Sequence, residues 1–363
     1  MNKQWIAVIV LGVASLVCAM PAGAEEASWH HPGLLRARDL TPFGLFRLDM
    51  LPAHTVDARH HSWALEVQSA YQNTFVLSDN VRDYLETRGT GRIPLRAQDA
   101  EAILALPEDA YYVDGEVGLI DLVIHKRMNT WWTAYLQVPY IGYGKGALDS
   151  TIESFHDGIG FSQQGRDLVA RNQFQLVYRV GDARFAQLDR SEGGFADPVI
   201  GVRYSFPEPR FGWDVVFEAA AKIAVDGERL FLSTGENDYG TQLTLQRRWG
   251  RHALYLAGSA VYYAAGPETP GDESQIIPTL IVGYGFGITR TTTAILQAYA
   301  SESTVQNAQV EELTENKYQL SIGLQQRTKH VLWSFAVTEN ISNFGNTPDI
   351  GVQLGIAYLP GAR

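Results

Sequence analysis

The segment at residues 350–358 reads IGVQLGIAY, and it alternates strictly between large apolar residues and small or polar ones. One face carries Ile350, Val352, Leu354, Ile356 and Tyr358. The opposite face carries only glycine, glutamine and alanine. Because successive side chains of a β-strand point to opposite sides, this period of two predicts a strand with two unlike faces.

The same alternation recurs along the chain after residue 60, and no helical period runs through it. It is found in residues 63–72, 118–127, 131–140, 172–178, 198–206, 213–223, 239–246, 252–262, 317–325 and 331–337, and it is blurred over 276–302. The less apolar face is rich in Gly, Ala, Ser, Gln and charge, whereas a soluble sandwich usually shows Lys, Glu and Thr there. Aromatic residues such as Trp132 and Tyr140 stand near the predicted strand ends, where they suit the boundary between water and lipid.

The spacing of the turns predicts how these strands are arranged. Short turns alternate with long polar segments, which is typical of a bacterial outer-membrane barrel. The sheet must then close, because lipid leaves no partner for an open edge. Counting one strand on each side of every turn predicts an all-β, antiparallel outer-membrane-type β-barrel of about 14 strands. The segment at 184–189 is brief, and 12 strands is the next even number. A secreted β-sandwich or an open barrel of soluble type is the alternative.

Composition excludes several other classes of protein. The chain has 363 residues, of which 45% are hydrophobic and 19% are charged, with a formal net charge of −11 and one cysteine. The negative charge argues against binding to nucleic acid as the main task. A single Cys excludes a disulfide scaffold. The mean hydropathy of −0.12 is too low for a bundle of membrane-spanning helices.

The N-terminus has the pattern of a secretory signal peptide. Lys3 precedes an apolar run at 6–20, which contains Cys18, and Ala22 to Ala24 form a small-residue cleavage site. We therefore predict a signal peptide at 1–24, cleaved after Ala24. Residues 25–60, with Leu34 and Leu35, are expected to form a periplasmic lead or a plug, because such an apolar cluster needs burial. The predicted barrel covers 61–363.

Two of the long segments contain predicted helices. Residues 96–106 predict a short helix in the first of them. In the segment 149–161, Ser150 and Glu153 fit a capping box, and Gly158 and Gly160 fit a helix end. This helix is expected to act as a plug, with a carboxylate-rich face of Glu153, His156 and Asp157 toward a polar lumen. The expected counter-charges are Arg127, Arg203 or Lys222 on the barrel wall.

The segment 152–157, IESFHD, together with Gly165 and Arg166, carries a resemblance to a known family. The chain resembles the gammaproteobacterial envelope family called domain of unknown function 3187. A Pro- and Leu-rich stretch at 32–42 and a strand with Asp349 and Gly355 agree with it. The resemblance implies a location in the cell envelope and this architecture, and it implies no activity. A departure from many outer-membrane barrels is the C-terminus, where residues 359–363 follow the last aromatic residue, Tyr358.

No residue is predicted to be catalytic, and neither a metal nor a cofactor is expected. Ser154, His156 and Asp157 are neighbours in one helical turn, so they cannot form a proton relay. The pairs His30-His31 and His60-His61 lack the further ligands that a metal site needs. The candidate residues are instead those of the lumen and the predicted plug, where mixed charge is normal. They are Glu66, Asp121, Arg127, Glu153, His156, Asp157, Arg166, Arg203, Asp214, Glu218 and Lys222.

These patterns predict a porin-like protein in the outer membrane of a Gram-negative bacterium. The function we expect is a gated or plugged channel or transporter for small solutes, hydrophobic ones among them. The alternatives are a lipid-modifying acyl hydrolase that uses His156, and a structural or interaction barrel without transport. The expected partners are outer-membrane lipid, the outer-membrane assembly machinery and a small-molecule solute, but no nucleic acid. The oligomeric state stays open.

Overall fold

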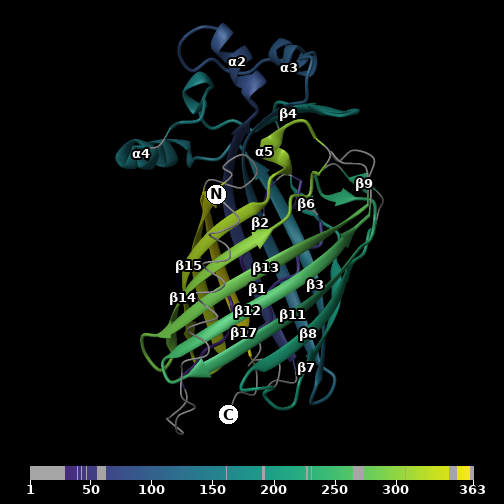
Figure 1. The fold of residues 1–363 in the computed structure, drawn as a ribbon, viewed down its shortest axis with the longest axis vertical. Coiled ribbons are helices and arrows are strands. Elements are labelled where there is room, and N and C mark those ends of the chain that lie inside the picture. The colour runs from purple at the N-terminus through teal and green to yellow at the C-terminus, as the bar shows by residue number, and fades with distance from the viewer. Residues whose placement is uncertain are drawn as a thin grey trace.

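Twelve antiparallel strands form a closed barrel in the computed structural model (Figure 1). The structure describes residues 29–359 except 39, 42, 46, 55–62, 161, 190–192, 226–227, 230, 265–273, 307 and 343–349. The predicted signal peptide and His60-His61 lie outside the described residues. In order around the barrel the strands are β1 (Trp63–Leu77), β2 (Ala110–Arg127), β3 (Trp132–Gly144), β7 (Val199–Ser205), β8 (Asp214–Lys222), β11 (Asp238–Trp249), β12 (His252–Tyr263), β13 (Gln275–Gly287), β14 (Thr292–Ser301), β15 (Lys317–Arg327), β16 (Val331–Ser342) and β17 (Ile350–Tyr358). Strand β17 pairs with β1, which closes the sheet.

The strands predicted at 172–178 and 184–189 exist, but they do not belong to the barrel wall. They are β4 (Gln175–Val180) and β5 (Ala183–Gln187), with six and five residues. A spanning strand needs about 9–11 residues, so both are too short. Strand β4 pairs with Ala110–Asp114 of β2, beyond the stretch Glu116–Arg127 that pairs with β3. The count of fourteen is therefore wrong, and the alternative of twelve is correct.

The two faces of the wall follow the predicted alternation. On β15, Ile322 is 62% exposed, whereas Gln319, three residues earlier and on the opposite face, is 2% exposed. On β8, Phe217 is exposed and its neighbour Glu218 is buried. The exposed face is apolar around the whole barrel, as lipid requires, and the buried face points into the lumen.

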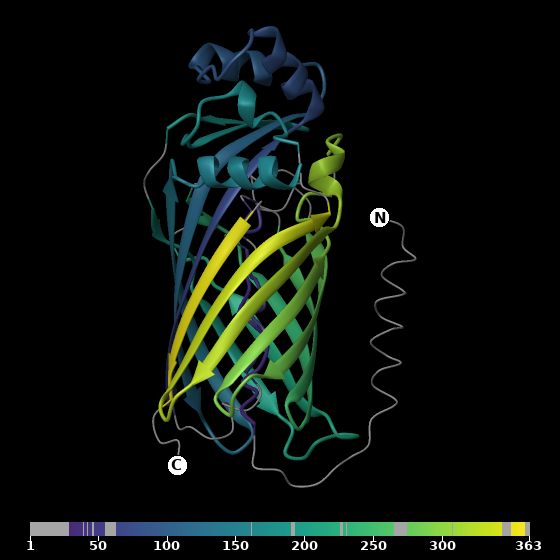
Figure 2. The ribbon, with the colours of Figure 1, turned by 90° about the vertical axis from the view of Figure 1, so that its left-hand side faces the viewer.

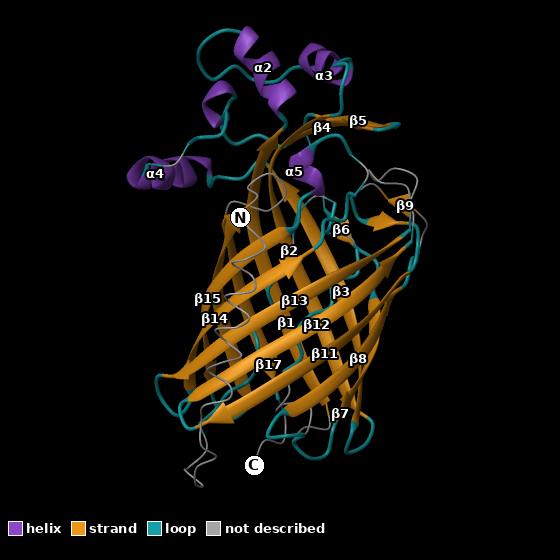
Figure 3. Cartoon of the chain, viewed as in Figure 1, coloured by secondary structure: helices purple, strands orange, loops and turns teal. Residues whose placement is uncertain are grey.

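The two ends of the barrel differ (Figure 2). Short turns join the strands at one end, which we call the short-turn end, and longer connections carry helices at the other, the long-loop end (Figure 3). The long-loop end holds α2 (Asp79–Thr87), α3 (Ala97–Leu104), α4 (Asp149–Ile159), the 3-10 turn η2 (Arg166–Leu168), α5 (Glu311–Thr314) and the short strands β6 (Gly194–Phe195), β9 (Glu228–Arg229) and β10 (Ser233–Thr234). No helix among the described residues is long and apolar enough to cross a membrane.

The helices α2 and α3 rest on the part of the sheet that continues beyond the barrel. Val81, Leu85 and Ile103 pack with Tyr112 of β2 and Val177 of β4 into one apolar cluster. Helix α3 corresponds to the helix predicted at 96–106, whereas α2 was not predicted. The extension of β1 and β2 past the barrel is therefore covered by its own small core.

Helix α4 confirms the helix predicted within 149–161 but not its predicted start. Its N-cap is Leu148, so Ser150 already lies inside the helix and makes no capping box. The helix ends at Gly160, whose φ of +78° lies in the left-handed region that favours glycine. Figures 1 and 2 show α4 at the long-loop end, to one side of the barrel wall.

We predict that Ile322→Arg destabilises the barrel by about 2–4 kcal/mol, because it places a charge on the lipid face near the middle of β15. Folding equilibria in lipid vesicles with urea measure the change. Ile322→Ala is the control, since it shortens the side chain without adding charge, and it should cost clearly less. Equal losses in the two variants would contradict a lipid-facing Ile322.

Candidate functional site

The lumen of the barrel is occupied by the chain's own N-terminal segment, seen as the purple trace inside the strands in Figure 2. We call residues 30–54 the N-terminal hairpin. It begins at the short-turn end, where the amide of His30 donates to the carbonyl oxygen of Arg290. It turns where Gly44 and Leu45 both donate to the carbonyl oxygen of Thr41, and then runs back. The ring of His54 lies 3.2 Å from the carbonyl oxygen of Leu34, so the two legs are side by side.

Glutamines of the barrel wall bind the main chain of this hairpin. Gln297 accepts from the amide of Leu35 at 2.9 Å and donates to the carbonyl oxygen of the same residue at 3.2 Å. Gln72 likewise accepts from the amide of Leu40 and donates to the carbonyl oxygen of Arg38. Further carbonyl oxygens accept from Gln242, Gln246 and Gln325. These amides replace the water that an extended chain would otherwise need for its polar groups.

Apolar side chains of the hairpin lie against glycines on the inner face of the wall. A Cβ atom at Gly323 would lie 2.9 Å from Leu35, and one at Gly240 would lie 2.7 Å from the sulfur of Met50. Both distances are shorter than a real Cβ contact, so a side chain at either position would force Leu35 or Met50 to shift. The glycines on the inner face therefore make room for the hairpin.

Two buried ion pairs fasten the hairpin to the wall. Arg36 contacts both carboxylate oxygens of Glu66, with Nε–Oε1 and Nη2–Oε2 distances of 2.7 Å. Arg38 contacts Asp121 at 2.7 Å and Asp49 of the other leg at 3.2 Å. The side chains of Arg36, Arg38, Glu66 and Asp121 are all at most 5% exposed. Such buried charges are tolerable only when paired, so Glu66 and Asp121 of the wall each depend on an arginine of the hairpin.

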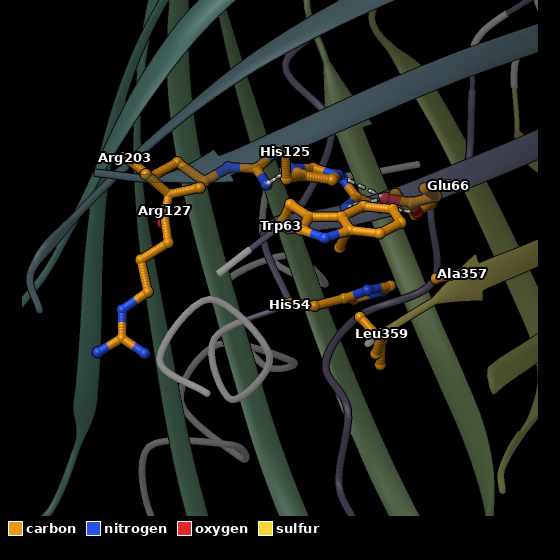
Figure 4. Close-up of a pocket in the computed structure, with 11 residues that line it drawn as sticks. His54, Trp63, Glu66, His125, Arg127, Arg203, Ala357 and Leu359 are labelled. Carbon is orange, nitrogen blue, oxygen red and sulfur yellow. Dashed lines mark hydrogen bonds and ion pairs between the residues drawn. The ribbon is translucent and has the colours of Figure 1, made fainter. Parts of the chain in front are cut away.

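The pair at Arg36 continues into a chain of charged groups along the wall (Figure 4). Nε2 of His125 lies 3.0 Å from Glu66, and its Nδ1 lies 3.3 Å from a guanidinium nitrogen of Arg203. Arg203 in turn contacts Glu218 at 2.6 Å. Because a guanidinium can only donate, Nδ1 of His125 accepts and Nε2–H donates to Glu66, which assigns the neutral imidazole.

The remaining predicted lumen residues lie at the two ends of the wall. Lys222 is buried near the long-loop end, 3.1 Å from Asp238. Asp214 contacts Arg248 at 2.7 Å at the short-turn end. Arg127 is half-buried beside the first short turn, and its Nε donates to the carbonyl oxygen of Asn129 at 3.0 Å. The predicted lumen residues therefore form several separate groups and not one site.

The charged face of α4 does not meet Arg127, Arg203 or Lys222, contrary to our expectation. Glu153 is buried against Arg92, at 2.7 Å, and against Arg171. Asp157 is exposed and accepts from Gln163 at 2.6 Å. The reason is that the long loops carry their own arginines, so the helix is neutralised at the long-loop end. The described contacts place the N-terminal hairpin, and not α4, in the lumen.

The other predicted residues of this segment are also bound locally. Arg166 is buried and donates to Asp149 at 3.0 Å and to Asn73 at 2.8 Å. His156 is buried, with 7% of its surface exposed. The hydroxyl of Ser154 donates to the carbonyl oxygen of Ser150, one turn earlier in the helix.

A group of carboxylates surrounds Arg166 beyond the barrel. Asp114 of β2 is 3% exposed, and burial raises the pKa of its carboxyl well above the ordinary value. The neighbouring charge of Asp149 raises this pKa further, while Arg166 opposes the shift. The carboxyl of Asp114 therefore keeps its proton to a higher pH than an ordinary aspartate does.

The described residues line cavities around the hairpin. One, of about 470 Å³ including its opening, lies at the short-turn end and is lined by Arg36, Glu66, His125, Arg127, Arg203 and Leu359, among others (Figure 4). Two smaller ones, of about 280 and 360 Å³, lie beside the turn and the returning leg of the hairpin, toward the long-loop end.

In the described part of the chain, no group of three or more His, Asp or Glu side chains is arranged to hold a metal ion. His31 of the first histidine pair lies 3.2 Å from the carbonyl oxygen of Gly250.

A family model described as "protein of unknown function (DUF3187)" matches residues 93–359. No curated protein matches the chain. Among solved structures, an outer-membrane channel from Pseudomonas putida F1 is similar over 82% of this chain and 95% of its own, with 10% identity and a TM-score of 0.48. The P. putida toluene transporter TodX is similar over 83% and 90%, with 9% identity and a TM-score of 0.39. The CymD monoaromatic hydrocarbon channel is similar over 91% and 94%, with 10% identity and a TM-score of 0.37. At these identities the likeness concerns the fold alone.

We predict that Glu66→Ala loosens the hairpin by about 3–5 kcal/mol, because Arg36 then loses its buried carboxylate partner. Limited proteolysis or hydrogen exchange of residues 30–54 measures the change. In the matched control, Glu66→Ala combined with Arg36→Met, no buried charge is left unpaired, and most of the loss should be recovered. A double variant as loose as Glu66→Ala would contradict this role of the pair.

We also predict a pH dependence from Asp114. Because its folded pKa is raised, the folded state holds a proton that the unfolded state releases, so stability falls as pH rises from the ordinary carboxyl range through the raised pKa. Asp114→Asn keeps the uncharged form and should protect β4 more at pH 8 than at pH 5, relative to the unmodified protein. Hydrogen exchange of residues 175–180 measures this, with exposed Asp83→Asn as control. An advantage independent of pH would refute a titrating Asp114.

Proposed function

The chain belongs to the DUF3187 family, and we propose that it is an outer-membrane channel for small solutes whose pathway is gated by the N-terminal hairpin. The observation that carries the proposal is the way in which the hairpin is held. It is bound by side-chain amides, two ion pairs and apolar contacts, and none of its described residues pairs as a strand with the wall. It can therefore leave the lumen without breaking any hydrogen bond of the closed sheet.

The lining of the lumen supports solutes of mixed character, hydrophobic ones included. Buried apolar side chains of β13 and β14 point inward, among them Ile277, Ile281 and Ile295. Wall glutamines alternate with them, so a vacated lumen has both apolar contact surface and hydrogen-bonding groups. The cavities at the two ends of the hairpin are then the two entrances of one pathway.

The proposal includes a location and partners. The protein reaches the outer membrane of a Gram-negative bacterium after cleavage behind Ala24, and the outer-membrane assembly machinery inserts it among lipids. The apolar outer face and the closed sheet support this location. The proposed function involves no catalytic step, no cofactor and no nucleic acid.

Two contacts of the described residues count against the acyl hydrolase alternative. The hydroxyl of Ser154 is bound to Ser150, and Asp157 accepts from Gln163. The alternative of a purely structural barrel differs from a gated channel in one respect, which is whether the hairpin ever leaves the lumen. Conductance measures that difference.

We predict that Arg36→Ala combined with Arg38→Ala raises the ion conductance of the mature protein in planar bilayers several-fold, because both ion pairs to the wall are lost. Arg82→Ala is the control, since this arginine pairs with Asp79 on α2, outside the barrel. It should leave conductance unchanged. Unchanged conductance in the double variant would favour a structural barrel.

A second variant closes the gate. Leu35→Cys with Ala336→Cys places two thiols on positions of hairpin and wall that lie in one buried cluster. A short bifunctional thiol reagent should abolish the openings, and the uncrosslinked double-cysteine protein should retain them. Persistent openings after complete crosslinking would contradict a gate formed by the hairpin.

A further inference from the structure

Positive charge collects at the short-turn end of the barrel. The five turns and their flanks at 126–132, 205–213, 247–252, 287–292 and 326–331 contain nine arginines and lysines and a single acidic residue, Glu208. The whole chain, by contrast, has a net charge of −11. A cluster of one sign around an opening concentrates ions of the other sign there, so this end attracts anions.

Basic side chains also line the cavity at this end of the barrel (Figure 4). Guanidinium groups of Arg36, Arg127 and Arg203 and the imidazole of His125 line it, against the carboxylate of Glu66. Figure 4 shows Arg127 extending away from His125 and Glu66, on the opposite side of the cavity from Leu359. Arg127 and Arg203 thus lie on one side of the cavity and Glu66, the partner of Arg36, on the other, with His125 between them.

One donor of this lining is not satisfied by the protein. Nη1 of Arg36 is buried and has no hydrogen-bond acceptor among the described residues. A buried guanidinium N–H without an acceptor is costly, and a carboxylate is the group whose geometry suits it best. This donor belongs to the same side chain that fastens the hairpin to Glu66.

Part of the lining beside Glu66 and His54 is apolar. Ala64, Ala357 and Leu359 line the cavity there and pack together with Leu332 as one small cluster. These side chains are at most 9% exposed, so the surface they offer faces the cavity and the lumen. A ligand that fills the cavity therefore needs an anionic head and a short apolar body.

We propose that this cavity binds a small organic carboxylate that arrives from the short-turn end. The carboxylate contacts the guanidinium groups, and the apolar body lies against Ala357 and Leu359. Because the ligand shares the guanidinium of Arg36 with Glu66, its binding weakens one of the two ion pairs of the hairpin. The consequence for gating rests on the proposed function, whereas binding itself does not.

Isothermal titration of the detergent-solubilised mature protein tests the site with pentanoate and with pentanamide, which has the same shape and no charge. We expect pentanoate to bind at least tenfold more tightly than pentanamide. Arg127→Gln should weaken pentanoate binding about fivefold or more. Lys329→Gln removes one positive charge from another turn of the same end, outside the cavity, and should change binding less than twofold.

The proposed site is contradicted if pentanoate and pentanamide bind equally well or if neither binds. It is also contradicted if Arg127→Gln and Lys329→Gln weaken binding of pentanoate equally. Conductance separates this failure from failure of the proposed function. If pentanoate does not bind but the Leu35→Cys/Ala336→Cys crosslink still closes the pore, the proposed channel is supported and the carboxylate site is contradicted. If pentanoate binds but neither the double arginine variant nor the crosslink alters conductance, the carboxylate site is supported and the proposed channel is contradicted.

Discussion

Every main-chain polar group inside a lipid-embedded barrel must find a partner within the protein, and most features of this structure follow from that constraint. The wall satisfies it by closing, with β17 paired to β1. The hairpin cannot join the closed sheet, so its amides and carbonyls are met by side chains such as Gln72 and Gln297. The same requirement applied to charge explains why Glu66 and Asp121 of the wall face arginines of the hairpin.

The architecture of the wall could be predicted from the sequence because it depends on a local period. Alternation along segments such as 350–358 and 317–325 is a property of neighbouring residues, and lipid on one side makes it strict. The strand count, by contrast, depends on which strands pair, and the partners of β2 lie far from each other in the sequence. Strand β2 has 18 residues, and its pairing passes from β3 to β4 where it leaves the membrane region. The six residues of β4 alternate like a spanning strand, but they are too few to cross.

The candidate site was predicted in part, and the missing part is pairing between distant residues. The inner faces identified Glu66, Asp121, Arg203 and Glu218 as lumen residues, and their burial agrees with that placement. The hairpin partners of Glu66 and Asp121, which are Arg36 and Arg38, were not predicted. Two arginines close behind Leu34 and Leu35 were a signal that this segment needs buried carboxylates. Glu153 was given the wrong partners, because Arg92 and Arg171 lie 61 and 18 residues from it and the sequence does not show that they converge.

The central claim is that the hairpin is held by side chains and not by strand pairing. Hydrogen–deuterium exchange of the membrane-embedded protein tests it most directly, by comparing amides of residues 34–51 with amides of β13 and β14. The account predicts that the hairpin amides exchange well before those of the two strands, and together, as one unit that leaves the lumen. Protection of the hairpin equal to that of β13 and β14 would contradict the claim, because the hairpin would then be as permanent a part of the barrel as its wall.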